Sequence, residues 1–301
     1  MYGHLESGYA SRSFMFIGAG QLLLPVITSS DDFEDGATVG LLPIFDCSAT
    51  RDRRCTYEYS ISHYSIAIFH LPAQRRGVDC ARLDLYGKPY SSTSRGPQNA
   101  LDVPFYANPR YQLLAFRLWM IKSNDVWSHY TLFVSTETIR RLAREFTLKS
   151  DSTQRVVHLA WEHWAQETRM VPEIRQMHHA HISQMRCLTL EKPVGQSGRS
   201  AKEVYCLYEF PSILSIRRDL ARREAASTAP DDNSSVISSK PGANIPVYVT
   251  HPSVIDHPDV WAKKIETALP FKKTLTTMTV EKHDGWQINE DCVIIRRRHP
   301  K

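Results

Sequence analysis

This chain of 301 residues contains no uninterrupted apolar run of about 18 to 20 residues, the length that a helix needs to cross a bilayer. Its N-terminus, MYGHLESGYASRSFMF, lacks the basic segment followed by an apolar one that marks a secretory signal peptide. We therefore predict a protein with no membrane partner and an intracellular location, in the cytoplasm or the nucleus.

Cysteine pairs with metal-ligand spacing are also missing. None of the six cysteines belongs to a C-x-x-C pair or stands at zinc-finger spacing from a histidine. Their even number permits disulfides, but a chain without a secretory signal is expected to keep its thiols reduced. Cys206 and Cys292 lie in apolar runs, where a free cysteine behaves as a small hydrophobic side chain.

Catalytic motifs are scarce in the same way. The chain has no nucleophile elbow, Walker loop, closely spaced carboxylate pair or kinase signature. Gly18-Ala19-Gly20 lacks the third glycine and the helix of a dinucleotide-binding loop, so it predicts a strand with a bend. A triad spread through the chain is recognised by geometry and not by order. The residues that are visible predict no enzyme and no cofactor.

Histidines are the exception, because they cluster in one segment. The segment His178–His181 follows His158 and His163 closely. His158 and Glu162-His163 spell H-x-x-x-E-H, which matches neither of the two zinc-protease patterns H-E-x-x-H and H-x-x-E-H. We predict a histidine-rich loop without a metal. The alternative is a hydrolase or metal-dependent enzyme that uses His163 with the segment His178–His181.

The charge is mildly basic, with a formal net charge of +5. Part of the excess is local, in arginines 217, 218, 222 and 223 and in arginines 296 to 298. Basic runs can follow a phosphate backbone. Neither run belongs to a recognisable nucleic-acid-reading motif, so we predict solvated segments and no nucleic-acid partner.

Hydrophobic periodicity predicts a mostly β chain. The alternation of polar and apolar residues in Tyr57–Leu71 is typical of a half-buried strand. Tyr111–Trp119 and Tyr130–Val134 are also predicted strands, and the turn residues Ser123-Asn124-Asp125 between them predict a hairpin. Further strands are predicted within 14–27 and at 39–45, 185–190, 203–210, 246–249, 269–273 and 293–295.

The period changes to that of a helix in one place. Ile139, Leu142, Ala143 and Phe146 fall on one helical face, and Ser135 or Thr136 is available as the N-cap. Residues 217–244 are charged and then rich in small polar residues. Because such a segment buries too little apolar surface to offset its ordering entropy, we predict a disordered insertion there.

The stretch VVHLAWEHWAQETRMVP, residues 156–172, holds two of the six tryptophans. Its pattern Trp161-x-x-Trp164-x(3)-Thr168-Arg169 resembles the W-x-x-W-G-P-x-x-T-R element in the C-terminal body of the large F-box protein family of mushroom-forming fungi. Ala165-Gln166 stands where that family usually has Gly-Pro. Other segments are similar to the family's strand–hairpin–helix block, to its strand ending in Leu-Pro and to its closing strands: Pro104–Ala107, Leu113-Leu114, Leu132–Ser135, Tyr64–Pro72, Leu269–Phe271, Asn289–Asp291 and Val293–Ile295.

The resemblance implies a function. Members of this family are expected to carry an N-terminal F-box, which docks the Skp-type adaptor of a cullin–RING ubiquitin ligase, and a C-terminal part that holds the substrate. No Leu-Pro-x-Glu helix stands before the first predicted strand. The chain therefore resembles the recognition half: a non-catalytic protein-interaction module that binds a protein substrate. A Skp-type adaptor is an expected partner only if an F-box lies upstream.

The resemblance also implies a β-propeller-like fold. Blades of about 40–45 residues would give about six or seven short antiparallel sheets, with one or two short helices. Residues 1–301 would then form a single β-rich recognition domain. Paired β-sandwiches are the structural alternative, because no sharp repeat is visible and 13 glycines are few for so many tight turns.

Exposed aromatic side chains are the expected contacts with a partner. Members of a tryptophan pair are often buried, so we expect two or three of the candidates to lie in the core. Arg169 is expected to pair with Glu162 or Glu167. The candidate partner-binding residues are Trp127, Trp161, Trp164, Arg169 and Trp286.

Overall fold

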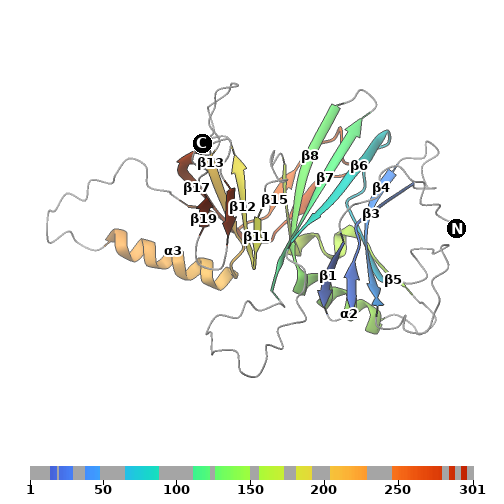
Figure 1. Cartoon of the computed structure of the whole chain (residues 1–301), viewed down its shortest axis with the longest axis horizontal. Helices are drawn as coiled ribbons and strands as arrows, with labels where there is room; N and C mark the ends of the chain where they lie inside the picture. The colour runs from blue at the N-terminus through green and yellow to red at the C-terminus, as the bar shows by residue number, and fades with distance from the viewer. Residues whose placement is uncertain are drawn as a thin grey trace.

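The computed structural model describes residues 14–18, 20–29, 38–47, 65–87, 111–122, 126–149, 156–172, 181–191, 204–228, 246–279, 285–288 and 293–296 (Figure 1). Two α-helices and two 3-10 helices lie in these ranges: α2 (Thr136–Lys149), α3 (Ile213–Thr228), η3 (Trp161–His163) and η4 (Ala165–Glu167). The strands are β1 (Met15–Gly18), β2 (Gln21–Leu23), β3 (Val26–Ser29), β4 (Thr38–Asp46), β5 (Ser65–His70), β6 (Val78–Tyr86), β7 (Leu113–Lys122), β8 (Val126–Ser135), β9 (Val157–Leu159), β10 (Thr168–Pro172), β11 (His181–Ser183), β12 (Arg186–Glu191), β13 (Val204–Glu209), β14 (Val247–Val249), β15 (Ser253–Ile255), β16 (Ile265–Thr267), β17 (Phe271–Thr279), β18 (Gly285–Ile288) and β19 (Val293–Arg296).

The first strands form the N-terminal sheet, in the order β1-β2-β4-β5-β9 with β3 also paired to β4. The predicted glycine bend is confirmed between β1 and β2, where Gly20 has a φ of 77° that a residue with a side chain rarely adopts. β9 joins β5 in a parallel pairing, with Ala67 opposite Val157.

The central sheet has the order β10-β8-β7-β6. The predicted hairpin is confirmed, because β7 and β8 pair antiparallel from Leu113 opposite Ser135 to Lys122 opposite Val126. β6 pairs with β7 through a bulge between Cys80 and Arg82. Figure 1 shows these strands between the N-terminal sheet and the sheet built by the second half of the chain.

The first core lies between the N-terminal and central sheets. Alternate residues of β7, Leu114, Phe116 and Leu118, face this core and are fully buried. Helix α2 covers it with the predicted face, in which Ile139 and Leu142 are buried. The predicted N-cap is confirmed, because the Oγ of Ser135 accepts a hydrogen bond of 2.9 Å from the backbone N–H of Thr138.

The second core lies on the other face of the central sheet. Leu113 and Ala115 of β7 and Phe133 of β8 pack there against Tyr208 and Phe271 of the C-terminal sheet. That sheet has the order β11-β12-β13-β17-β14. The remaining strands form two hairpins, β15–β16 and β18–β19.

The mostly β prediction is confirmed, with several antiparallel sheets and few helices. No closed barrel or propeller is detected in the ranges that the structure describes. Instead, one sheet has a hydrophobic core on each face. The four described cysteines, Cys47, Cys80, Cys187 and Cys206, are free thiols. Within the described ranges, no helix is long and apolar enough to span a membrane.

The prediction of disorder from residue 217 is wrong for its first part, because α3 runs through to Thr228. Alanine and arginine are strong helix formers, so this segment needs little burial to be helical. Ile216 is its one buried side chain between residues 213 and 222. Residues 229–244 of the predicted insertion lie outside the described residues.

Candidate functional site

The predicted tryptophan pair lies in a short connection between β9 and β10, built from η3 and η4. Trp164 is only 1% exposed and donates its indole N–H to the backbone oxygen of His70, 3.1 Å away. Its ring contacts Phe69 and Trp161 edge to face, with centroids 5.3 Å and 4.9 Å away. Trp164 is therefore a core residue whose polar atom is already satisfied.

The Thr168-Arg169 pair that closes this connection is buried as well. Arg169 is 1% exposed, and its guanidinium donates to the Leu269 oxygen at 2.7 Å, the Ser253 Oγ at 2.7 Å and the His251 oxygen at 3.2 Å. Burial lowers the pKa of Arg169 to about 10. Arg169 thus ties β10 to the C-terminal half of the chain.

The expected ion pair of Arg169 with Glu162 or Glu167 is wrong. Glu167 pairs instead with Arg141 of α2, which also pairs with Glu145 at 2.9 Å, and these bonds raise the pKa of Arg141. The sequence could not show this, because α2 lies over the connection only in the folded chain.

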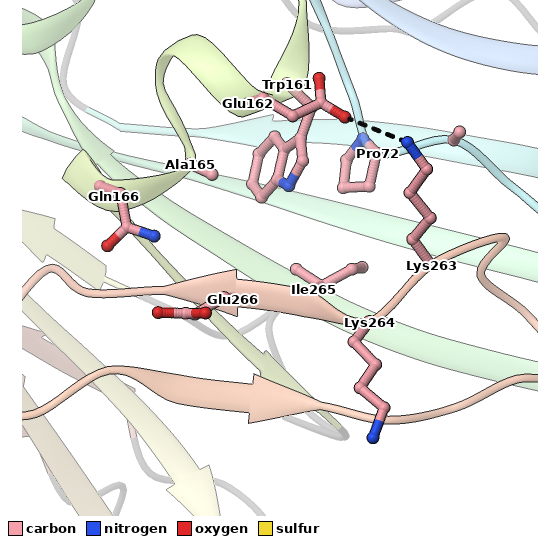
Figure 2. A pocket seen from close by; sticks show the side chains of 10 residues that line it. Pro72, Trp161, Glu162, Ala165, Gln166, Lys263, Lys264, Ile265 and Glu266 are labelled. Carbon is pink, nitrogen blue, oxygen red and sulfur yellow. Dashed lines mark ion pairs between the residues drawn. The ribbon is translucent and has the colours of Figure 1, made fainter.

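Trp161 lines a pocket of about 260 Å³ beside this connection. Figure 2 shows its indole ring between Pro72 and Ala165, with Ile265 on the opposite side. Charged and amide side chains surround this apolar floor, and the ion pair between Glu162 and Lys263, at 4.0 Å, crosses the rim. The pocket is lined by Pro72, Ala73, Trp161, Glu162, Ala165, Gln166, Lys263, Lys264, Ile265 and Glu266.

The indole nitrogen of Trp161 lies on the side of the ring that faces Pro72 and Ile265 (Figure 2). No acceptor for its N–H is present among the described residues, in contrast to the satisfied N–H of Trp164. Trp161 itself is only 8% exposed. The part of this side chain that a ligand can reach therefore combines an apolar edge with a hydrogen-bond donor.

Trp127 belongs to a different surface, which we call the aromatic face: Arg82, Arg117, Trp119, Trp127 and His129. These side chains lie on the face of the central sheet opposite the first core, beyond the second core. The pairing of the strands aligns them, because Trp119 stands opposite both Arg82 of β6 and His129 of β8. Neighbouring strands thus bring together residues from distant parts of the sequence.

Trp119 is the centre of the aromatic face. The Arg117 and Arg82 guanidinium groups lie 4.2 Å and 5.5 Å from its ring centroid, and the His129 ring lies 4.3 Å away. Trp127 contacts Trp119 edge to face at 6.1 Å and remains 47% exposed. Desolvation lowers the pKa of Arg117, and Arg82 also pairs with Asp84. The result is a fixed cluster of planar groups with Trp127 at its accessible edge.

Of the predicted contact residues, Trp161, Trp164 and Arg169 therefore lie in one connection, and Trp127 lies apart from them. The side chain of Trp286, in β18, lies outside the described residues. The prediction missed Trp119 and Arg82. The alternation in β7, where residues 117, 119 and 121 share a face, was the signal that could have found Trp119.

The histidines of the alternative enzyme are placed only in part. The His163 ring packs on Phe146 at 5.3 Å, and His181 begins β11. His178 and His179 lie outside the described residues. In the described ranges, no group of three or more potential ligands could hold a metal ion.

The comparisons with known proteins are negative. No protein-family model, curated protein or solved structure matches this chain. The resemblance to fungal F-box proteins stays a prediction, and the described residues present two candidate binding surfaces. The aromatic face offers planar side chains and cations at a rigid sheet. The Trp161 pocket offers a small apolar floor with a hydrogen-bond donor.

Proposed function

We propose that the chain is a non-catalytic protein-interaction module and that it contacts its partner through the aromatic face. The observation that carries this proposal is the half-exposed ring of Trp127, which is held edge to face against Trp119, the ring over which the Arg82 and Arg117 guanidinium groups lie. Tryptophan and arginine are the residues most enriched among the energetic centres of protein interfaces. Their side chains here are fixed by the sheet before binding, so little conformational entropy is lost on association.

The charges of this face favour a protein over a polyanion. Arg82 and Arg117 are balanced by Asp84, which pairs with Arg82, and by Asp79, which stands opposite Ile121 on the same face. A surface without net charge gains no counterion-release advantage from nucleic acid. A partner segment with an aromatic or aliphatic side chain would cover Trp127 and exclude water from Arg82, whose side chain is exposed, whereas Arg117 is already buried.

By resemblance, the partner would be a substrate for ubiquitylation, and the chain would be the recognition half of an F-box-type ligase subunit in the cytoplasm or nucleus. This part of the proposal rests on the sequence patterns alone. It does not require a propeller, since the contact surface lies on a single sheet. Sequencing the native transcript upstream of the codon for Met1 tests it. An in-frame F-box that co-purifies with a Skp-type adaptor supports it, and a full-length product that binds no such adaptor contradicts it.

Capture of binding partners by the wild type and by variants of the aromatic face tests the interaction surface. Partners bound by the wild type should bind Trp127→Ala about 30-fold more weakly, as expected for an energetic centre of an interface. Arg82→Ala should weaken the binding of the same partners. Leu148→Ala, at an 80% exposed position of α2, is the control and should bind normally. Equal capture by all variants, with their folding verified by circular dichroism, would contradict the proposal.

A further inference from the structure

We propose that the Trp161 pocket binds a proline-containing extended segment of a protein partner. This inference rests on the proposed function as a protein-binding module but uses a different surface from the aromatic face. It names the chemistry of one contact: a proline ring on the apolar floor and a backbone carbonyl on the indole N–H of Trp161.

The size of the pocket restricts what it can hold. Pockets for drug-sized ligands and cofactors are about 300–1,000 Å³, whereas this one is about 260 Å³. It therefore accommodates one or two side chains of a peptide rather than a cofactor. Its floor is apolar where Trp161, Pro72 and Ile265 meet (Figure 2), so the inserted side chain should be compact and apolar.

The hydrogen-bonding groups at the floor call for an acceptor. The indole N–H of Trp161 has no protein acceptor within the described ranges, and the exposed amide of Gln166, on the opposite side of the ring, has none there either. Trp164, three residues on, shows the contrast, because the backbone of His70 already takes its N–H. An occupant that leaves the Trp161 N–H unpaired would incur its desolvation cost. A backbone carbonyl next to an apolar side chain satisfies both features of the site.

Proline-containing segments present that combination. In the polyproline II conformation the backbone has no internal hydrogen bonds, so its carbonyls are free to accept, and the rings are apolar and preorganised. Aromatic-lined grooves recognise such segments for this reason. A helix, in contrast, has used its carbonyls in its own hydrogen bonds.

The charges of the rim complement an uncharged segment. Glu162 and Glu266 balance Lys263 and Lys264, and the rim pair Glu162–Lys263 is long and mostly exposed. Lys264 is further occupied by Asp256, 2.7 Å away. The rim thus has no net positive charge to select a phosphate or a carboxylate ligand. Neutral proline-rich sequence fits it better than an acidic peptide.

Nuclear magnetic resonance of the indole N–H groups tests the inference on the whole chain. The probe is a short blocked peptide of alternating alanine and proline, and the control peptide has glycine in place of each proline. Trp161→Phe assigns the Trp161 resonance by its disappearance. We expect the proline peptide to shift this resonance at millimolar concentration and the glycine peptide to leave it unchanged.

Two variants separate binding from folding. Trp161→Phe removes the donor and should weaken binding about three- to tenfold, the range for one neutral hydrogen bond, as read in both proteins from the backbone amide resonance of Ile265 in the same pocket. Ala73→Phe fills the pocket from an exposed position and should abolish the shift while the fold is retained. No shift with the proline peptide, or an equal shift with the glycine peptide, overturns the inference. If partner capture still depends on Trp127, the proposed function survives that result.

Discussion

Arg169 is unusual among buried arginines because its described acceptors are two backbone oxygens and a hydroxyl. A guanidinium has five N–H donors in a fixed fork, so one side chain can span three acceptors on separate segments. Its contacts with Leu269, Ser253 and His251, and the Phe271 ring under its guanidinium, make it part of the framework that joins β10 to the C-terminal half of the chain. It is not a contact available to a partner.

Replacing Arg169 should therefore affect stability. Arg169→Ala should lower the free energy of unfolding by about 3 kcal/mol, because the Leu269 and His251 oxygens lose a charged donor. Arg169→Lys should lower it by about 1–2 kcal/mol, since an ammonium cannot reproduce the fork. Urea denaturation measures both, with Arg144→Ala at an exposed position of α2 as the control. A loss no larger than that of the control would contradict this role.

His70 and His158 form a second polar contact at this scale, with Nε2 of His70 2.9 Å from Nδ1 of His158. Burial, followed by the neighbouring His158 ring, lowers the pKa of His70 from its ordinary value of 6.5. The folded state therefore disfavours the protonated ring. The stability that this contributes is present above pH 6.5 and is lost as the pH falls through the lower pKa of the folded state.

We predict that the wild type loses more unfolding free energy than His70→Gln between about pH 7.5 and pH 5. The glutamine variant cannot take up a proton at this position, so its stability should change less steeply with pH. Urea midpoints measured across this range test the difference. Parallel pH profiles for the two proteins would show that the His70–His158 contact does not influence stability.

At the scale of elements, α2 begins where β8 ends, and one residue serves both. Ser135 closes the ladder opposite Leu113 and caps the helix through its Oγ. Ser135→Ala should cost about 1 kcal/mol of stability, whereas Ser135→Thr, which keeps a capping oxygen, should cost less. Thermal and urea unfolding compare the two. Equal losses would indicate that burial at this position matters more than the cap.

Within residues 213–222 of helix α3, Ile216 is the one buried side chain, while Leu214 is 68% exposed. Ile216→Ala should therefore destabilise α3 by about 2–4 kcal/mol, and Leu214→Ala should stay within about 0.5 kcal/mol. Hydrogen exchange of the α3 amides reports the effect locally. Similar exchange in both variants would mean that α3 does not depend on this contact.

The sequence predicted β7, β8 and α2 well, because β7 and β8 contain apolar segments on either side of turn residues and α2 has an unbroken helical period. It missed β6 for a physical reason. Val78 and Cys80 face the first core. The bulge between Cys80 and Arg82 adds one residue, so the side chains that face this core change from even-numbered to odd-numbered positions, at Leu83 and Leu85. Alternation read along the chain is broken at that point. α3 was missed because its helix depends on propensity with little burial, which a search for apolar faces overlooks.

At the scale of the whole molecule, sharing one sheet between two cores should make unfolding cooperative. Leu113 and Leu114 are neighbours on β7 and are both fully buried, one in the second core and the other in the first. We predict that Leu113→Ala and Leu114→Ala each lower stability by about 3 kcal/mol and that each variant still unfolds in one transition. Far-ultraviolet circular dichroism and tryptophan fluorescence should give the same midpoint. Two separated transitions would show that the cores unfold independently.

The stacking of the sheets could not be predicted from local patterns. β5 pairs with β9, and β13 pairs with β17, so neighbours in the sheets are separated by long connections. The same holds for the surfaces. Trp161 was a candidate from its sequence pattern, but its pocket also needs Pro72 and Ile265, which lie far from it in the chain. The aromatic face needs the register of three strands, which no single segment contains.

The hydrogen bond from Arg169 to Leu269 has a consequence for the chain during synthesis, because 100 residues separate the two. At a synthesis rate of about 5–20 residues per second, β10 emerges about 5–20 seconds before its acceptor. Throughout that interval, the nascent first half carries a cation that its own residues do not enclose. A product terminated before Leu269 never acquires the enclosing segment. We expect such a product to be less stable than the finished protein, because Arg169 lacks the acceptor at Leu269.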